Sequence, residues 1–198
     1  MLRWFVVHSI VPLAVLEAVK NLDTPVEDGL TEFADELLVK RLGLSTTVQM
    51  QLTEFEQLVR KDARVEPSHV EALLRLVGRR PDADLVFADA GRRAARRAVR
   101  RMSGVIRMFG HAAARRAARA VLGADLGFEQ RLPVARVSDS IAIQATPDGA
   151  ACGFYSAGLV ELLRLLVGYE GAMLHVVCRA RGGTACEWRA AGPDPRHQ

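Results

Sequence analysis

All three cysteines of the 198-residue chain lie in its last quarter, together with one nearby histidine. They follow the pattern C-x22-H-x2-C-x7-C, which comprises Cys152, His175, Cys178 and Cys186. Three thiolates and one imidazole are a complete tetrahedral donor set for a structural Zn²⁺ ion, which prefers sulfur and nitrogen ligands. The pattern therefore predicts a zinc site with four protein ligands.

Two other chemistries fit the same residues. The spacing contains no C-x-x-C pair of the kind found in zinc ribbons. Three buried thiols that act as small apolar side chains in a reduced protein are therefore an alternative. A Cys178–Cys186 disulfide is another, although it leaves Cys152 without a partner.

The elements that must position these residues are a β-hairpin and the helix before it. Residues 173–180 and 181–190 are typical of two antiparallel strands, with Gly182-Gly183 in the turn. In a regular strand His175 and Cys178 point to opposite faces. One ion can bind both only if the strand bulges between them, or if His175 lies at the strand entrance. The first cysteine of the pattern precedes an amphipathic helix that packs back on this sheet.

The same stretch resembles the 4-vinyl-reductase domain, a small-molecule-binding module of a bacteriochlorophyll-synthesis protein and of the sensor regions of aromatic-responsive transcriptional activators. The family pattern is a cysteine, an aromatic residue, a glycine-containing helix, a strand ending in Cys-x-Ala/Gly-x-Gly, and a final cysteine with an aromatic residue. Its counterparts in this chain are Cys152, Phe154, Tyr155, Gly158, residues 178–182, Cys186 and Trp188. Where the sensor members have an acidic zinc ligand, this chain has His175.

The resemblance implies a fold akin to the TRAPP vesicle-tethering subunits, with helices on a small antiparallel sheet, and often a homodimer. We expect non-catalytic binding or sensing of a hydrophobic, aromatic or tetrapyrrole-like molecule, or an accessory role in bacteriochlorophyll synthesis. The candidate ligand-binding residues are His111, Phe109, Met108, Phe128, Phe154 and Tyr155. Alternatively, these residues belong to an ordinary core, because phenylalanine and methionine at helical spacing usually pack there.

Charge is unevenly distributed along the chain, whose formal net charge is +4. Residues 1–78 carry eight basic and 12 acidic side chains, whereas residues 79–136 carry 14 basic and five acidic ones. A helix predicted over residues 83–101 places six arginines in pairs that repeat every four residues. We term these six the arginine face: Arg92, Arg93, Arg96, Arg97, Arg100 and Arg101. The opposite side of that helix suits close helix packing and carries Ala94, Ala95, Ala98 and Val99.

The arginine face has two interpretations. It could bind an acidic partner, an anionic membrane surface or a nucleic-acid backbone. Alternatively, it is a solvated face with acidic residues from the first 78 positions packed nearby. Neither a base-reading motif nor interleaved aromatic residues accompany it, so nucleic acid is not the favoured partner.

The hydrophobic pattern predicts an α+β fold in one domain over residues 1–191, followed by a tail over residues 192–198. Its parts are a helical segment (1–80), arginine-rich helices (81–123) and a β-β-α-β-β unit with the cysteines (124–191). Within the unit, strands are expected over residues 131–137 and 140–146, with Asp139 in the turn. The expected helices cover residues 12–22, 25–43, a segment within 45–64, 67–78, 83–101 and 104–122. Thr53 is a possible N-cap of the helix within 45–64, and Gly123 ends the last helix.

The apolar N-terminus lacks a small-residue cleavage site and is interrupted by His8 and Pro12, and it is too short to span a bilayer. We therefore expect an extended segment and then a helix, and we do not favour membrane contact. With 49% hydrophobic and 25% charged residues, the chain is typical of a cytoplasmic globular protein. It shows no nucleophile elbow, dinucleotide-binding glycine motif or P-loop, so we expect no catalysis.

Overall fold

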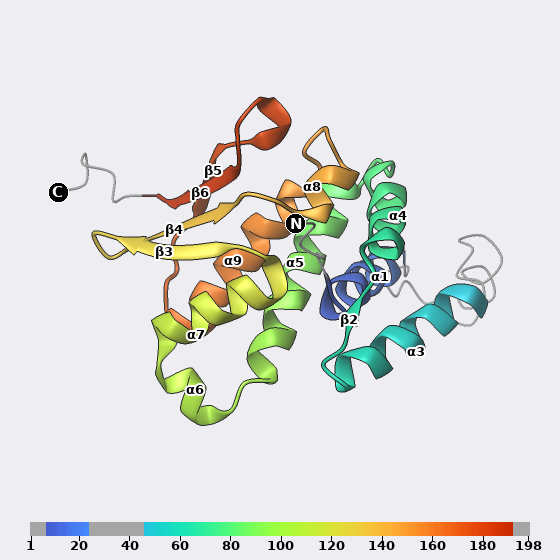
Figure 1. Ribbon diagram of the computed structural model, residues 1–198, viewed down its shortest axis with the longest axis horizontal. Coiled ribbons are helices and arrows are strands. Elements are labelled where there is room, and N and C mark those ends of the chain that lie inside the picture. The colour runs from blue at the N-terminus through green and yellow to red at the C-terminus, as the bar shows by residue number, and fades with distance from the viewer. Residues whose placement is uncertain (1–6, 24–45, 192–198) are drawn as a thin grey trace, which may run out of the picture.

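The structure is a computed structural model that describes residues 7–23 and 46–191. It confirms the predicted α+β class: helices come first, and a four-stranded antiparallel sheet follows (Figure 1). The predicted helix over 25–43 and the tail over 192–198 lie outside the described residues. In chain order the elements are β1 (Val7–His8), α1 (Ile10–Asp23), α3 (Thr46–Arg60), β2 (Arg64–Val65), α4 (Pro67–Gly78), α5 (Ala83–Arg100), α6 (Gly104–Met108), α7 (Gly110–Ala117), the π-helical turn η1 (Ala118–Leu122), β3 (Asp125–Glu129), β4 (Leu132–Val137), α8 (Ile141–Ala145), α9 (Cys152–Val167), β5 (Met173–Val177), the 3-10 turn η2 (Arg179–Arg181) and β6 (Cys186–Ala190).

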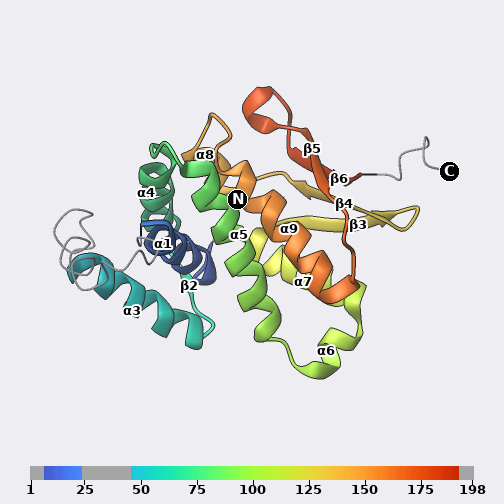
Figure 2. The ribbon, with the colours of Figure 1, turned by 180° about the vertical axis from the view of Figure 1, so that it is seen from behind.

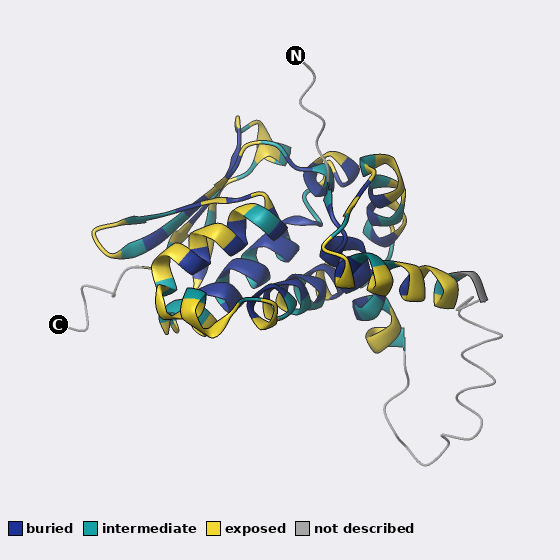
Figure 3. Cartoon of the chain, turned by 60° about the horizontal axis from the view of Figure 1, so that its bottom comes forward, coloured by how far each residue is buried: buried dark blue, intermediate teal, exposed yellow. Residues whose placement is uncertain are grey.

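Helices α5 and α9 pack against each other with their backbones in close contact. The predicted small-residue side of α5 is buried, including Ala94 and Ala98. A Cβ on Gly91 would lie 2.1 Å from the carbonyl oxygen of Phe154, and one on Gly158 would lie 3.3 Å from the carbonyl oxygen of Gly91. Only glycine leaves room for this approach. Buried residues accordingly run along the inner faces of the helices, and exposed ones along the outer faces (Figure 3).

The main sheet has the strand order β3-β4-β6-β5, and each neighbouring pair is antiparallel. Helix α9 runs alongside this sheet (Figure 2). Trp188 of β6 is fully buried, and its indole N–H donates to the Ser156 hydroxyl of α9 at 2.7 Å. This hydrogen bond joins the middle of the sheet to the helix that begins with the first cysteine.

One of the two strands predicted before the cysteine helix is wrong. Residues 140–146 alternate like a strand, but Ile141–Ala145 form α8, and Ser140 caps it by accepting a hydrogen bond from the Ala142 N–H at 3.2 Å. The partner of β4 is instead β3. The two strands are joined by Gln130 and Arg131, which have positive φ values of 49° and 69°. This pair replaces the Asn-Gly dipeptide that normally marks such a turn.

The helix predicted over residues 104–122 is divided into α6, α7 and η1. Phe109 lies between α6 and α7 with φ −91° and ψ 55°, outside the helical region. A Cβ on Gly110 would lie 2.3 Å from the carbonyl oxygen of Leu166, so α7 contacts the backbone of α9 from its first residue. Gly123, with φ 64°, ends η1 as predicted.

The N-terminal helices agree with the prediction in type and differ in their ends. Helix α4 begins at Pro67 as expected. Helix α3 begins at Thr46, so Thr53 does not cap it. The Thr53 hydroxyl donates to the carbonyl of Gln49 within the helix, at 3.0 Å.

From Val7 onward the chain is extended and then helical, as predicted. Strand β1 pairs with β2, which places Val7 opposite Val65, and α1 begins at Ile10. None of the helices in the described ranges has both the length and the apolar character that crossing a bilayer requires.

Four members of the arginine face form ion pairs within the fold. Two of their partners come from the acidic first 78 residues, which is the packing that the second interpretation predicted. Arg92 and Arg100 are exposed, and no described carboxylate pairs with them. The four pairs are Arg93–Asp89, Arg96–Glu161, Arg97–Glu17 and Arg101–Asp62.

Glu161 is the buried member of this network. Its carboxylate accepts hydrogen bonds from Arg96 at 2.6 Å and from Arg164 at 2.9 Å, and so it joins α5 to α9. The bonds from Arg164 and Arg96 hold the pKa of Glu161 below its usual value. Because the folded pKa lies below the unfolded one, the stabilisation is present above about pH 4.3 and is lost as the pH falls through the folded pKa.

We expect Gly91→Ala to lower the free energy of unfolding by about 1–3 kcal/mol, because the methyl group must push α5 and α9 apart. Gly104→Ala is the matched control, since no atom lies within 4 Å of its Cβ position. Urea denaturation of both variants measures the difference. Equal midpoints for the two variants would contradict the close packing of the helices.

We expect Glu161→Gln to lower the free energy of unfolding at pH 7 by about 1–2 kcal/mol, because two arginines lose their buried acceptor. The deficit should shrink as the pH falls below about 4.3 and largely vanish below the lowered pKa of the folded carboxyl group, where the wild-type side chain is also protonated. Denaturant titrations over this pH range test the prediction. The exposed Glu54→Gln variant serves as control, and a deficit that is independent of pH would count against the ion network.

Candidate metal centre and the adjoining cavity

The structure brings the four predicted metal ligands into one cluster. Cys152 is the first residue of α9, His175 lies in β5, Cys178 directly follows β5, and Cys186 begins β6. One donor atom from each residue can be chosen so that all four lie within 4.8 Å of one another. The Sγ atoms of Cys152 and Cys178 are 4.0 Å apart. The cluster therefore has the composition and spacing to hold a metal ion.

A β-bulge makes this convergence possible. His175 pairs with Trp188, whereas Val177 pairs with Glu187, so the register of β5 and β6 shifts between them. The extra residue breaks the strict alternation of side chains along β5. As a result, His175 and Cys178 reach the same cluster although they are three residues apart. The sequence analysis required such a bulge for both residues to bind one ion, and the structure contains it.

The polar atoms of the cluster fit the role of metal ligands. Nε2 of His175 is buried and has no hydrogen-bond partner among the described residues. The imidazole stacks on the indole of Trp188, with ring centroids 4.5 Å apart and planes at 10°. The Sγ atom of Cys186 accepts a hydrogen bond from the Arg179 N–H at 3.3 Å, which stabilises a thiolate. A buried nitrogen without a partner is costly, and a bound cation would satisfy it.

Burial in the cluster disfavours charged thiolates in the absence of a cation. Burial, and then the charges of the other two thiols, raise the pKa of Cys152, and burial raises the pKa of Cys186. Burial lowers the pKa of His175, so its imidazole is neutral at pH 7. The thiols of Cys152 and Cys186 therefore stay protonated at pH 7 until a bound cation displaces their protons and offsets the charge of the thiolates.

The distance between two of the sulfur atoms also agrees with tetrahedral ligation. Sulfur ligands of one zinc ion are about 3.8 Å apart, because each Zn–S bond is about 2.3 Å long. The 4.0 Å between Cys152 and Cys178 is close to that value, and the three cysteines are free thiols. Gly149, with φ 89°, lies against the cluster: its Cβ position is 3.7 and 3.8 Å from the same two sulfurs. The loop before α9 therefore approaches the sulfurs without a side chain.

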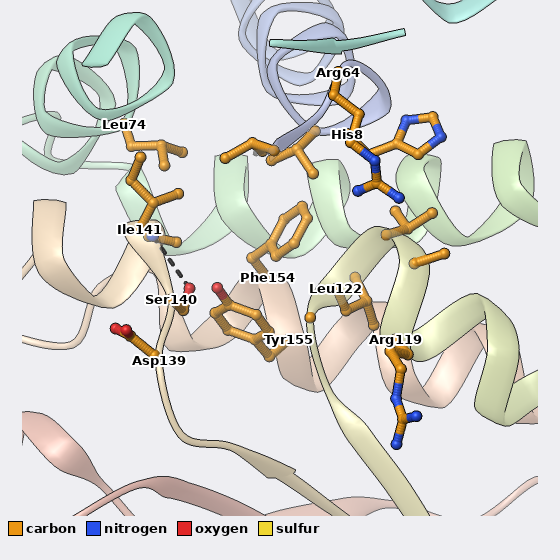
Figure 4. Close-up of a pocket in the computed structure, with 16 residues that line it drawn as sticks. His8, Arg64, Leu74, Arg119, Leu122, Asp139, Ser140, Ile141, Phe154 and Tyr155 are labelled. Atoms are coloured by element: carbon orange, nitrogen blue, oxygen red, sulfur yellow. Dashed lines mark hydrogen bonds between the residues drawn. The ribbon is translucent and has the colours of Figure 1, made fainter. Parts of the chain in front are cut away.

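A cavity of about 230 Å³ lies on the other side of the first turns of α9. Phe154 and Tyr155 form part of its wall, with Leu74, Leu122 and Ile141 (Figure 4). The hydroxyl of Tyr155 forms no hydrogen bond with any described residue, although its side chain is almost completely buried. An apolar chamber with a free hydroxyl is the usual composition of a small-molecule site.

Of the six predicted ligand-binding residues, Phe154 and Tyr155 line this cavity. The other four lie elsewhere. Met108 and Phe109 are 84% and 68% exposed, because the helix is broken beside them. His111 packs edge-on against Phe128 at 4.4 Å, outside the cavity.

The remaining cavity wall comes from segments that sequence reasoning did not assign to a site. His8 enters through the pairing of β1 with β2, and Ser140 through the cap of α8. Nε2 of His8 is 3.3 Å from the carboxylate of Asp62. For His8 the only signal in the sequence was that it interrupts an apolar run. Ser140 gave no signal, because residues 140–146 were predicted to form a strand.

Trp188 lies between the cluster and the cavity. Its indole stacks on His175 of the cluster, and its ring centroid is 5.6 Å from that of Tyr155 in the cavity wall. Trp188 therefore neighbours both a metal ligand and a residue of the cavity wall.

Comparisons of the chain with protein-family models, with curated proteins and with solved structures found no match.

Proposed function

We propose that the protein is a non-catalytic module that binds or senses a small apolar molecule and that a structural zinc ion holds its C-terminal hairpin against α9. The observation that carries the proposal is the position of α9. Its first residue, Cys152, belongs to the metal cluster, and Phe154 and Tyr155 in its first turn line the cavity. One helix thus joins both sites.

Zinc is the ion that suits this donor set. Cys152, Cys178 and Cys186 supply soft thiolates and His175 supplies an imidazole, which is a full shell for tetrahedral zinc. With four protein ligands no coordination position is left for water, so the ion would act on stability rather than on chemistry. Ligation would hold the β5–β6 hairpin against the start of α9.

The cavity favours a small aromatic or acyl ligand. Its volume of about 230 Å³ is below the roughly 300–1,000 Å³ of most drug-sized ligand sites, and this favours a small ligand over a tetrapyrrole. The resemblance to the 4-vinyl-reductase domain supports the small-molecule reading. Three further expectations stay predictions: a role in bacteriochlorophyll synthesis, assembly as a homodimer and a location in the cytoplasm.

Binding through the arginine face is the less favoured alternative. Four of its six residues form internal ion pairs, which leaves Arg92 and Arg100 as its unpaired charges among the described residues. Two exposed charges on one helix are a small surface for an acidic partner or a membrane.

We expect the purified protein to contain one equivalent of zinc, and His175→Ala to weaken zinc binding by roughly 100-fold or more, because changes even outside the ligand shell cost 10–100-fold. Native mass spectrometry reports the metal and any retained small molecule together. A chelator competition then gives the affinity. His111→Ala is the matched control, since that histidine contacts Phe128 away from the cluster. Equal affinities for the two variants would refute the zinc assignment.

We expect a chelator to shift the fluorescence of Trp188 to longer wavelength, because its buried indole stacks on a metal ligand and would meet water once the hairpin loosens. A Trp4→Phe background leaves Trp188 as the single tryptophan of the chain. In this background, His175→Ala should show the shifted emission before any chelator is added. Unchanged emission in the chelated protein would mean that the metal does not hold the hairpin.

A further inference from the structure

The apolar cavity opens beside a group of arginines that the arginine face does not include. A depression on the surface is lined by Arg64, Arg115, Arg116 and Arg119. It shares Arg64, Arg119 and Ala120 with the wall of the cavity. Figure 4 shows the guanidinium groups of Arg64 and Arg119 on one side of the cavity, with Asp139 and Ser140 on the other. We term the four arginines the basic rim.

The positive charge of the basic rim is poorly compensated. Arg119 is 2.6 Å from Asp125, but the two side chains are 78% and 70% exposed, and such a pair contributes little. Arg115 lies over the ring of Phe128 at 5.5 Å. Within the described part of the chain, Arg64 and Arg116 have no carboxylate partner. An anion at the rim would therefore gain charge-assisted hydrogen bonds without breaking a strong ion pair.

The opposite end of the cavity determines how such an anion would lie. The carboxylate of Asp139 accepts hydrogen bonds from Gln144 at 2.7 Å and from Arg179 at 3.4 Å, so it is already satisfied. It would repel a second carboxylate. The side chain of Tyr155 is almost completely buried, and its hydroxyl, which has no hydrogen-bond partner among the described residues, can bond to a neutral polar group there.

We infer that the ligand is an apolar carboxylic acid with an aromatic or short acyl body, whose carboxylate binds Arg64 and Arg119 at the basic rim while its body fills the cavity. The inference rests on the proposed function, since it names the chemical class of the molecule in the same cavity. The guanidinium groups of the rim give the charge complementarity, and the apolar wall excludes water from the body of the ligand.

A matched pair of probes tests the inference. 4-Ethylbenzoate and 4-ethylphenol have similar bodies, but the first is an anion at pH 7 and the second is neutral. By isothermal titration calorimetry we expect the benzoate to bind about tenfold more tightly or better, which is the effect of one charge-assisted hydrogen bond. The Arg64→Gln/Arg119→Gln double variant should lose this preference and still bind the phenol. Arg92→Gln is the control, because that arginine is exposed and outside the cavity.

Each outcome decides between the two proposals. If the wild type binds both probes equally, the acid class is wrong and the small-molecule function stands. If it prefers the benzoate and the double variant does too, the carboxylate is recognised elsewhere and the basic rim is refuted. If neither probe binds to folded, zinc-loaded protein, the proposed function fails as well. Circular dichroism of each variant shows that the substitutions leave the fold intact.

Discussion

Contact between the backbones of α5 and α9 is the constraint from which the site follows. Gly91 lies so close to the carbonyl of Phe154 that no side chain fits between the helices. The same contact fixes the first turns of α9, which carry Cys152 on the cluster side and Phe154 and Tyr155 on the cavity side. A buried carboxylate, Glu161, then fixes the two helices along their length through Arg96. The positions of the Cys152 sulfur and of the two aromatic rings thus depend on the absence of a side chain at Gly91.

The sequence allowed the metal cluster to be predicted more fully than the cavity, for a physical reason. Thiols and imidazoles are few, so their spacing is informative, and strand geometry showed that His175 and Cys178 needed a bulge to meet. A cavity has no such signature, because its wall is assembled from apolar residues that are common everywhere. His8, Leu74 and Ile141 reach it through long-range pairing and packing that periodicity does not encode.

The errors have equally local causes. The β3–β4 turn uses Gln130-Arg131 in left-handed conformations, a pair that does not signal a hairpin. The strand pattern over 140–146 was overridden by a serine cap. The helix predicted over 104–122 is broken at Phe109, and the break leaves Met108 and Phe109 exposed. Helix type was thus predictable where the pattern was long, as in α5, and unreliable over five to seven residues.

The place of Trp188 between His175 and Tyr155 has a thermodynamic consequence. If the indole orders both neighbours, occupancy of one site changes the affinity of the other, and linkage requires the effect to be equal in the two directions. A molecule that tightens around Tyr155 would raise the affinity for the metal, and saturation with metal would raise the affinity for that molecule by the same factor. Affinities for either species would then have meaning only at a stated concentration of the other.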